Sequence, residues 1–378
     1  MINSTGHSNT TVGPNATAPT PNDWPYVPID PKQGVILMLI TIPGVLGNIV
    51  AFATTVKLLS TRVIAANYLV LALTLTDFYG ILLCTLPTHL CYVYLRWVGG
   101  HAMCQFQGFS AMFASLASGC LATAMAVDRL LAITKPFQYK KLVNPKRAIY
   151  SAATIWVFSF VLSAIPIGGI GRFKRNLTGT FCTIDWFAET VSNIVFAAFY
   201  AFLGIILVFV IVYCNVKVII GLRNIKRKRE TELTSGTLRY DGGKKITSSA
   251  DVLERQLARS VCVISVLFLI CWLPFMFRIV CNLGGWWKNP WVDVQVSRLL
   301  LFNFVLDPFL YTFSRKQCRD IMFDWFCCCF RNLRVKKGLS LKALAARRKE
   351  TFSEHSTKMQ SSTLEGGVST ESSEDSRL

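Results

Sequence analysis

Residues 190–220 read TVSNIVFAAFYAFLGIILVFVIVYCNVKVII, and Lys217 is the one charged residue among them. A helix needs about 20 apolar residues to cross the hydrocarbon core of a bilayer. Because lipid offers no hydrogen-bond partners, every backbone amide in such a segment must be paired within the chain, as it is in a helix. Six further apolar segments of similar length lie at approximately 34–58, 66–95, 104–134, 148–168, 257–283 and 293–313. The chain is therefore predicted to be an all-α membrane protein, a bundle of seven transmembrane helices.

Composition supports this prediction. Of the 378 residues, 52% are hydrophobic and 16% are charged, with a mean hydropathy of +0.42, which is too apolar for a protein surrounded by water. The net charge of +19 is unevenly placed: residues 215–255 hold ten Lys and Arg, and residues 312–378 hold thirteen. Excess Lys and Arg mark the cytoplasmic side of a membrane protein. Anionic lipid of the inner leaflet explains these basic segments, so no nucleic-acid partner is expected.

The amino terminus is predicted to lie outside the cell. Glycosylation sequons begin at Asn3, Asn9 and Asn15, and seven crossings place this end opposite the basic tail. We therefore expect a multi-pass protein of the plasma membrane. Its predicted parts are an extracellular glycosylated segment (1–33), the transmembrane domain (34–313), an amphipathic helix with a cysteine cluster (314–330) and a disordered cytoplasmic tail (331–378).

Polar residues occur where lipid should exclude them. Asn48, Asp77, Ser118, Asn303 and Asp307 all lie within apolar segments. An intramembrane carboxylate is costly unless it faces water or a partner, so these residues predict one polar cluster in the bundle. Repulsion between two close carboxylates should keep one protonated or recruit a cation such as sodium near Asp77. The alternative is that the cluster merely holds the helices together.

Three motifs resemble those of class A G-protein-coupled receptors. Residues 128–130 are Asp-Arg-Leu, residues 271–274 are Cys-Trp-Leu-Pro, and residues 307–311 are Asp-Pro-Phe-Leu-Tyr. They are similar to the DRY, CWxP and (N/D)PxxY signatures and occur in the same order. Over residues 34–330 the chain is identified as a member of this class, and the resemblance implies a disulfide bond between Cys104 and Cys182.

The resemblance also implies roles in activation for these motifs. Arg129 would bond Asp128 at rest and turn toward a heterotrimeric G protein when the sixth helix moves. Pro274 should kink that helix. Four more residues complete the expected set: Trp272 as a lever below the ligand, Pro308 within the seventh-helix motif, and Tyr311 and Tyr213, which would meet through water in the active state.

Residues that this chain lacks exclude two classes of ligand. An amine receptor of this class needs an aspartate where this chain has Ala111, and a retinal pigment needs a lysine where it has Leu301. What is present is Arg298, near the extracellular end of the seventh helix. Arginine stays ionised and pairs with carboxylate or phosphate, so a ligand anion is expected there. The alternative is that Arg298 reaches outward to lipid headgroups.

The region around Arg298 resembles the prostanoid receptors, most of all a prostaglandin E receptor of the cyclase-stimulating type. Arg298 precedes Asn303 by five residues and Asp307-Pro308 by nine, which is the family spacing, and residues 178–186 resemble the family's second-loop pattern. The resemblance implies that Arg298, Tyr92 and Thr180 hold a ligand carboxylate, with the loop as a lid. The sequence departs from the family at several positions, and a sequon at Asn176 lies inside this lid.

The carboxyl-terminal region predicts further partners. Cys327, Cys328 and Cys329 follow an amphipathic stretch at 314–326, as palmitoylated cysteines do. Phosphorylation of the Ser- and Thr-rich residues 351–376 would create a surface for arrestin. The final residues 376–378 could add as a strand to a PDZ domain.

The leading hypothesis is a receptor for a lipid carboxylate such as prostaglandin E. The sequence shows no metal cluster, nucleophile triad or phosphate loop, so neither an enzyme nor a cofactor is expected. Alternatives that stay open are a divergent or orphan receptor for another anionic lipid or a peptide, a transporter or ion-conducting bundle that uses Asp77 and Asp307, and a scavenger receptor that does not signal.

Overall fold

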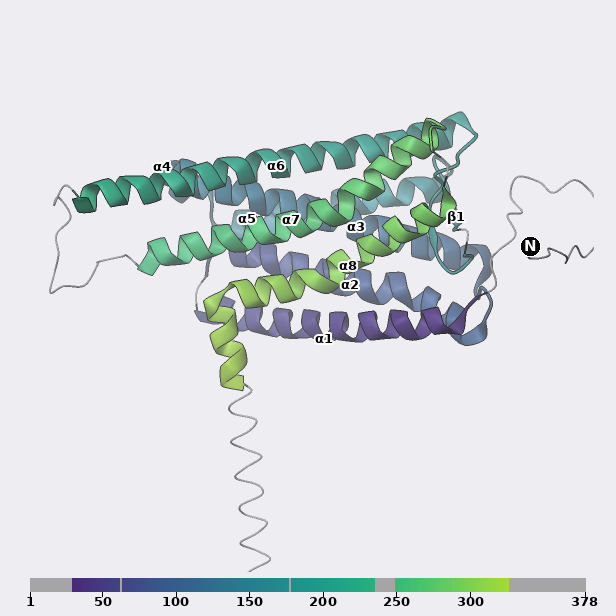
Figure 1. Cartoon of the computed structure of the whole chain (residues 1–378), viewed down its shortest axis with the longest axis horizontal. Coiled ribbons are helices and arrows are strands. Elements are labelled where there is room, and N and C mark those ends of the chain that lie inside the picture. Colours follow the sequence, from purple (N-terminus) through teal and green to yellow (C-terminus); the bar gives the residue numbers. More distant parts are fainter. Residues whose placement is uncertain (1–28, 62, 177, 235–248, 288, 326–378) are drawn as a thin grey trace, which may run out of the picture. The chain divides into compact units, whose positions relative to one another are not determined.

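The computed structural model describes residues 29–61, 63–176, 178–234, 249–287 and 289–325. Seven long helices lie side by side in a bundle, as predicted (Figure 1). They are α1 (Pro31–Thr61), α2 (Ala65–Tyr94), α3 (Gly100–Thr134), α5 (Pro145–Ala164), α6 (Val191–Thr234), α7 (Ser249–Leu283) and α8 (Pro290–Ser314). All seven are long and apolar enough to cross a bilayer. A short helix α4 (Pro136–Leu142) follows α3.

The faces of these helices suit a lipid environment. Large apolar side chains point outward, as Leu39 and Phe209 do with exposed fractions of 69% and 70%. Polar side chains point inward, and Asp77 and Asn303 are each 1% exposed. This pattern, the reverse of that in a soluble protein, is stable where the surrounding solvent is hydrocarbon. α3 lies at the centre: 72% of its most apolar 18-residue stretch is buried, against 22% for the corresponding stretch of α5.

Close packing of α1 depends on two glycines. A Cβ atom on Gly44 would lie 2.2 Å from Cδ1 of Ile81, and one on Gly47 would lie 2.8 Å from the ring of Phe309. Small residues let membrane helices approach this closely, because their association relies on van der Waals contact more than on the hydrophobic effect. The glycines thereby bring α1 against α2 and α8.

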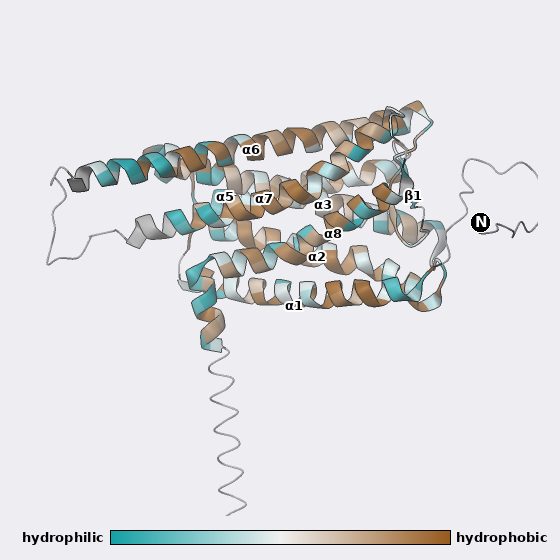
Figure 2. Ribbon diagram, in the orientation of Figure 1, coloured by the Kyte–Doolittle hydropathy of each residue, from teal (hydrophilic) through white to brown (hydrophobic). Residues whose placement is uncertain are grey.

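α6 extends beyond its apolar segment. Its apolar segment was predicted to end near residue 220, but the helix continues to Thr234. Figure 2 shows the change from apolar to hydrophilic residues along it. The added residues are rich in Lys, Arg and Glu, which are strong helix formers, and Lys226 and Glu230 form an exposed i,i+4 ion pair of 3.6 Å. The composition of residues 221–256 predicts a flexible or partly helical cytoplasmic loop, and within it residues 221–234 and 249–256 are helical.

One end of the bundle carries a hairpin, and we call this the hairpin end. A 3-10 helix η1 (Ile165–Gly168) leads into β1 (Phe173–Arg175), which pairs antiparallel with β2 (Cys182–Ile184). These strands were not predicted. The disulfide bond between Cys182 and Cys104 of α3 is present, as the resemblance implied, and joins β2 to the bundle.

Two further segments singled out in the sequence, around Pro274 and after residue 314, are helical. Pro274 lies inside α7, and the helix continues through it. Residues 316–325, within the stretch predicted to be an amphipathic eighth helix, are helical.

Candidate functional site

A cavity opens between the helices at the hairpin end. Its volume is about 380 Å³, in the range of small-molecule sites. Most of its wall is apolar and comes from α1, α2, α3, α8 and β2, with Tyr200 of α6 and Phe275 of α7 at its side. Tyr92, Thr180 and Arg298, predicted together from the family resemblance, all line this one cavity.

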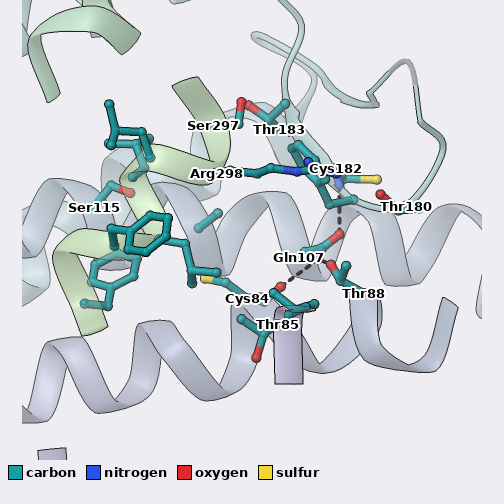
Figure 3. Close-up of a pocket in the computed structure, with 18 of the residues that line it drawn as sticks. Cys84, Thr85, Thr88, Gln107, Ser115, Thr180, Cys182, Thr183, Ser297 and Arg298 are labelled. Carbon is teal, nitrogen blue, oxygen red and sulfur yellow. Dashed lines mark hydrogen bonds between the residues drawn. The ribbon is translucent and has the colours of Figure 1, made fainter. Parts of the chain in front are cut away.

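Arg298 is the one cationic side chain among the described residues of the cavity wall. It lies eight residues after the start of α8, or about 12 Å along the helix, which is two turns rather than the single turn expected from the sequence. Figure 3 shows its side chain directed from α8 toward Cys182 and Thr183 of β2. It is half-buried, and the described part of the chain offers it no ion pair. A guanidinium placed in this way can pair with an anion, and the ligand contact of Arg298 stays a prediction.

Thr180 approaches the cavity from the hairpin. It is 2% exposed, and its Oγ1 shares a hydrogen bond of 2.7 Å with Oγ1 of Thr178. Thr178 Oγ1 also accepts a hydrogen bond of 2.8 Å from Nδ2 of Asn176. The hydroxyl predicted to contact the ligand is thus linked to the side chain of the loop sequon. Tyr92 is half-buried beside Gly34 of α1.

Gln107 holds the hairpin against the helices and was not predicted from the sequence. Its Nε2 donates to the carbonyl of Cys84 (2.7 Å) and to Oγ1 of Thr88 (2.9 Å), both on α2. Its Oε1 accepts from the backbone N–H of Cys182 (2.8 Å), as Figure 3 shows. A glutamine three residues after Cys104, inside an apolar segment, was the signal available, because a buried amide needs partners on both its atoms.

Four of the five predicted polar residues form one buried cluster deeper in the bundle. Ser118 Oγ donates to Oδ1 of Asp77 (3.3 Å), and Asn303 Nδ2 donates to Ser118 Oγ (3.3 Å) and to Oδ2 of Asp307 (3.0 Å). Asn48 instead donates to the carbonyls of Gly44 and Phe304. The role of the cluster, and a sodium ion near Asp77, remain predictions.

Trp272 of α7 contacts a residue of the cavity wall but does not itself line the cavity. It is 1% exposed and stacks on Phe268, with ring centroids 4.7 Å apart. Its ring also lies 6.5 Å from that of Tyr200, which lines the cavity. Trp272 is thus one ring contact away from the cavity, and its role as a lever stays a prediction.

At the other end of the bundle, Arg129 is buried and contacts Asp128, the arrangement expected at rest. Its Nε donates to Oδ2 of Asp128 at 3.0 Å, and Nη2 donates to the hydroxyl of Tyr139 at 3.0 Å. Tyr311 is buried and accepts a hydrogen bond from Arg315, which also donates to Oδ1 of Asn67 at 3.0 Å. Arg315 was not anticipated.

Tyr213 and Tyr311 are not brought together in this conformation. Tyr213 is 59% exposed on α6, with the ammonium of Lys217 5.7 Å from its ring, whereas Tyr311 is 3% exposed. The predicted water-mediated contact belongs to a different, active conformation, and stays a prediction.

Comparison with known proteins gives the family. The family model described as 7 transmembrane receptor (rhodopsin family) matches residues 47–311. The chain belongs to the rhodopsin family of seven-transmembrane receptors. The receptor is similar to the prostaglandin E2 receptor EP4 subtype of Oryctolagus cuniculus, with 27% identity over 309 residues. That match covers 72% of this chain and 63% of the rabbit protein.

Two further relatives are informative. The prostacyclin receptor of Mus musculus is 27% identical over 297 residues, which covers 77% of this receptor and 69% of the mouse protein. The crystal structure of squid rhodopsin superimposes with a TM-score of 0.71 at 20% identity, covering 83% of this chain and 87% of that one. The second likeness is evidence for the fold alone.

Several predicted modification sites lie outside the described residues: Asn3, Asn9, Asn15, Cys327, Cys328 and Cys329. Cys318, which was not predicted to be palmitoylated, lies among the described residues. It is fully buried, and burial raises the pKa of its thiol. Since the thiolate is the reactive form, Cys318 is a poor acceptor for an acyl group.

Proposed function

We propose that this receptor binds a lipid carboxylate of the prostanoid class, such as prostaglandin E, and activates a heterotrimeric G protein. The observation that carries the proposal is Arg298, a half-buried cation that has no ion pair with any described residue and lines a mostly apolar cavity. A ligand that fits must combine one anionic group with a long apolar body, and a twenty-carbon fatty acid derivative does so.

The surroundings of Arg298 support a carboxylate as the anion. A guanidinium can donate two parallel hydrogen bonds to one carboxylate, and two residues that carry hydroxyl groups, Tyr92 and Thr180, line the same cavity. The prostaglandin E2 and prostacyclin receptors among the relatives are named for ligands of this chemistry. In this proposal the hairpin acts as the lid, and its end of the bundle faces the outside of the cell at the plasma membrane.

The signalling part of the proposal rests on the opposite end of the bundle. The contacts of Arg129 with Asp128 and of Arg315 with Tyr311 would open when the cytoplasmic half of α7 moves, so that Arg129 becomes available to a G protein. We favour the cyclase-stimulating G protein. Arrestin binding to the phosphorylated tail and a PDZ domain on the last three residues complete the proposed partners.

A second candidate is a receptor for a larger anion or an acidic peptide. The hairpin carries Arg172, Lys174 and Arg175, and Arg172 is exposed. These charges lie on the hairpin and not in the cavity wall, so a ligand that depends on them would bind at the surface. The two candidates differ in which arginine they require.

The test is cyclic AMP production in cells that express the receptor, across a panel of prostanoids, with Arg298→Ala and the matched variant Arg172→Ala. A hydrogen bond to a charged group contributes about 1.5–3 kcal/mol, so Arg298→Ala should raise the EC50 of prostaglandin E2 roughly 10- to 150-fold. Arg172→Ala should leave it unchanged.

Two results would contradict the proposal. Silence across the panel, with the protein at the cell surface and a set of G-protein dissociation sensors equally silent, would exclude a prostanoid ligand. Loss of response in Arg172→Ala but not in Arg298→Ala would favour the peptide or larger anion.

A further inference from the structure

A second arginine lies buried at the hairpin end, between α7 and α8. Arg278 of α7 is 1% exposed, and its Nε donates to Oδ1 of Asp293 on α8 at 2.7 Å. Asn282, one turn further along α7, donates from Nδ2 to Oδ2 of the same carboxylate at 2.9 Å. Both oxygens of Asp293 are therefore bonded to α7.

Three of the four remaining N–H donors of Arg278 are also used. Nη2 donates to Oδ1 of Asn282 (2.9 Å), and Nη1 donates to the carbonyl of Trp287 (2.7 Å) in the segment that joins α7 to α8. The ring of Trp287 lies 4.8 Å from the guanidinium carbon. Nη2 also donates to the carbonyl of Asn289 at 3.4 Å, so four of the five N–H donors of Arg278 are used, and the side chain contacts α7, the connecting segment and α8 at once.

This cluster differs from the cavity in its chemistry. Arg278, Asn282 and Asp293 are absent from the cavity lining, and their charges neutralise one another, whereas Arg298 has no such partner among the described residues. Breaking a buried ion pair by removing one partner leaves an uncompensated charge, so the two helices are strongly held in the paired arrangement. Bonds to both carboxylate oxygens also fix the rotation of α8 about its axis.

We propose that Arg278, Asn282 and Asp293 form a clamp that positions Arg298. Arg298 follows Asp293 by five residues on the same helix, so fixing the rotation and height of α8 at Asp293 fixes where the Arg298 side chain enters the cavity. The three clamp residues are positioning residues. The purpose assigned to the clamp rests on the proposed role of Arg298 in ligand binding.

The first arm of the test needs no ligand. Cys281 is next to Asn282, is 4% exposed and carries a free thiol. The purified receptor in lipid nanodiscs is treated with a water-soluble maleimide, and the labelling rate of Cys281 is followed by peptide mass spectrometry. We expect at least tenfold faster labelling in Asp293→Asn and in the milder Asn282→Ala, and no change in Arg172→Ala. An unchanged rate in both clamp variants would overturn the proposal.

The second arm separates positioning from general stability. We expect Asp293→Asn to raise the EC50 of prostaglandin E2 at least fivefold at equal surface expression. In the Arg298→Ala background the same change should add no further loss, because a clamp that acts through Arg298 has nothing left to position. Losses that add in the double variant would show a merely structural role and refute the proposal. If the wild-type receptor ignores prostaglandin E2, the proposed function fails, while the labelling arm still decides whether the clamp exists.

Discussion

Removing the side chain of Gln107 should loosen the hairpin at one identifiable backbone amide. In Gln107→Ala, the buried N–H of Cys182 loses its acceptor, which costs about 1–3 kcal/mol. The hydrogen bond to Thr88 is also lost, at about 1 kcal/mol, whereas the carbonyl of Cys84 keeps its place in α2. Local opening of the hairpin should therefore become easier by about 2–4 kcal/mol, summing these terms.

Hydrogen–deuterium exchange measures this effect. The peptide that contains Cys182 should exchange roughly 30- to several-hundred-fold faster in Gln107→Ala than in the wild-type receptor, at tenfold for each 1.4 kcal/mol. Thr88→Val is the matched control: it removes one bond of Gln107 but keeps the bond to Cys182, so exchange should change by no more than about tenfold. Exchange at Cys182 within threefold of wild type in Gln107→Ala would refute the reasoning. It would mean that the disulfide bond and the strand pairing hold the hairpin without this side chain.

Two further predictions concern Arg315 and Cys318, at the end of the bundle opposite the hairpin. Arg315→Met removes the hydrogen bonds to Asn67 and Tyr311, and should shift the receptor toward the active state by roughly five- to thirty-fold, an energy of about 1–2 kcal/mol. Basal G-protein activation, normalised to surface expression, measures this shift, and equal activity in Arg315→Met and in the exposed-site control Lys316→Met would contradict it. Because burial raises the pKa of Cys318, its thiol should resist alkylation near neutral pH and react faster as the pH rises. Rapid labelling of Cys318 at pH 7 in the folded receptor, at the rate seen after denaturation, would show that the thiol is not protected.

The seven helices could be predicted because each apolar segment is long enough by itself to cross a bilayer. The end of α6 could not, because hydropathy falls at residue 220 while helix propensity does not. Local composition therefore located the membrane boundary of this helix and missed its physical end.

The candidate site was predicted in part. Arg298, Tyr92 and Thr180 were expected together, and they line one cavity. The polar cluster was expected from the rule that intramembrane carboxylates need partners, and Asp77 and Asp307 do lie in it. Tyr92 and Thr180 were expected because the resemblance to prostanoid receptors implies them, whereas Asp77 and Asp307 were informative by residue type and position alone.

The residues that escaped prediction act through partners distant in the sequence. Arg278 and Asp293 are 15 residues apart on different helices, and Gln107 and Cys182 are 75 residues apart. Arg278 and Asp293 are charged residues inside apolar segments, as Asp77 is. The rule that such charges need a partner could therefore have drawn attention to them. Their pairing needed the arrangement of the helices, which periodicity does not provide.

The side chain of Asn176 has a consequence for how a sugar can be attached to the hairpin. Its amide nitrogen has two hydrogens, and one of them is directed to Oγ1 of Thr178. N-glycosylation replaces one hydrogen on this nitrogen. A glycan that keeps the hairpin intact must therefore take the other hydrogen's place, and so leave the protein in one direction. An oligosaccharide at this position would be oriented by the fold from its first bond onward.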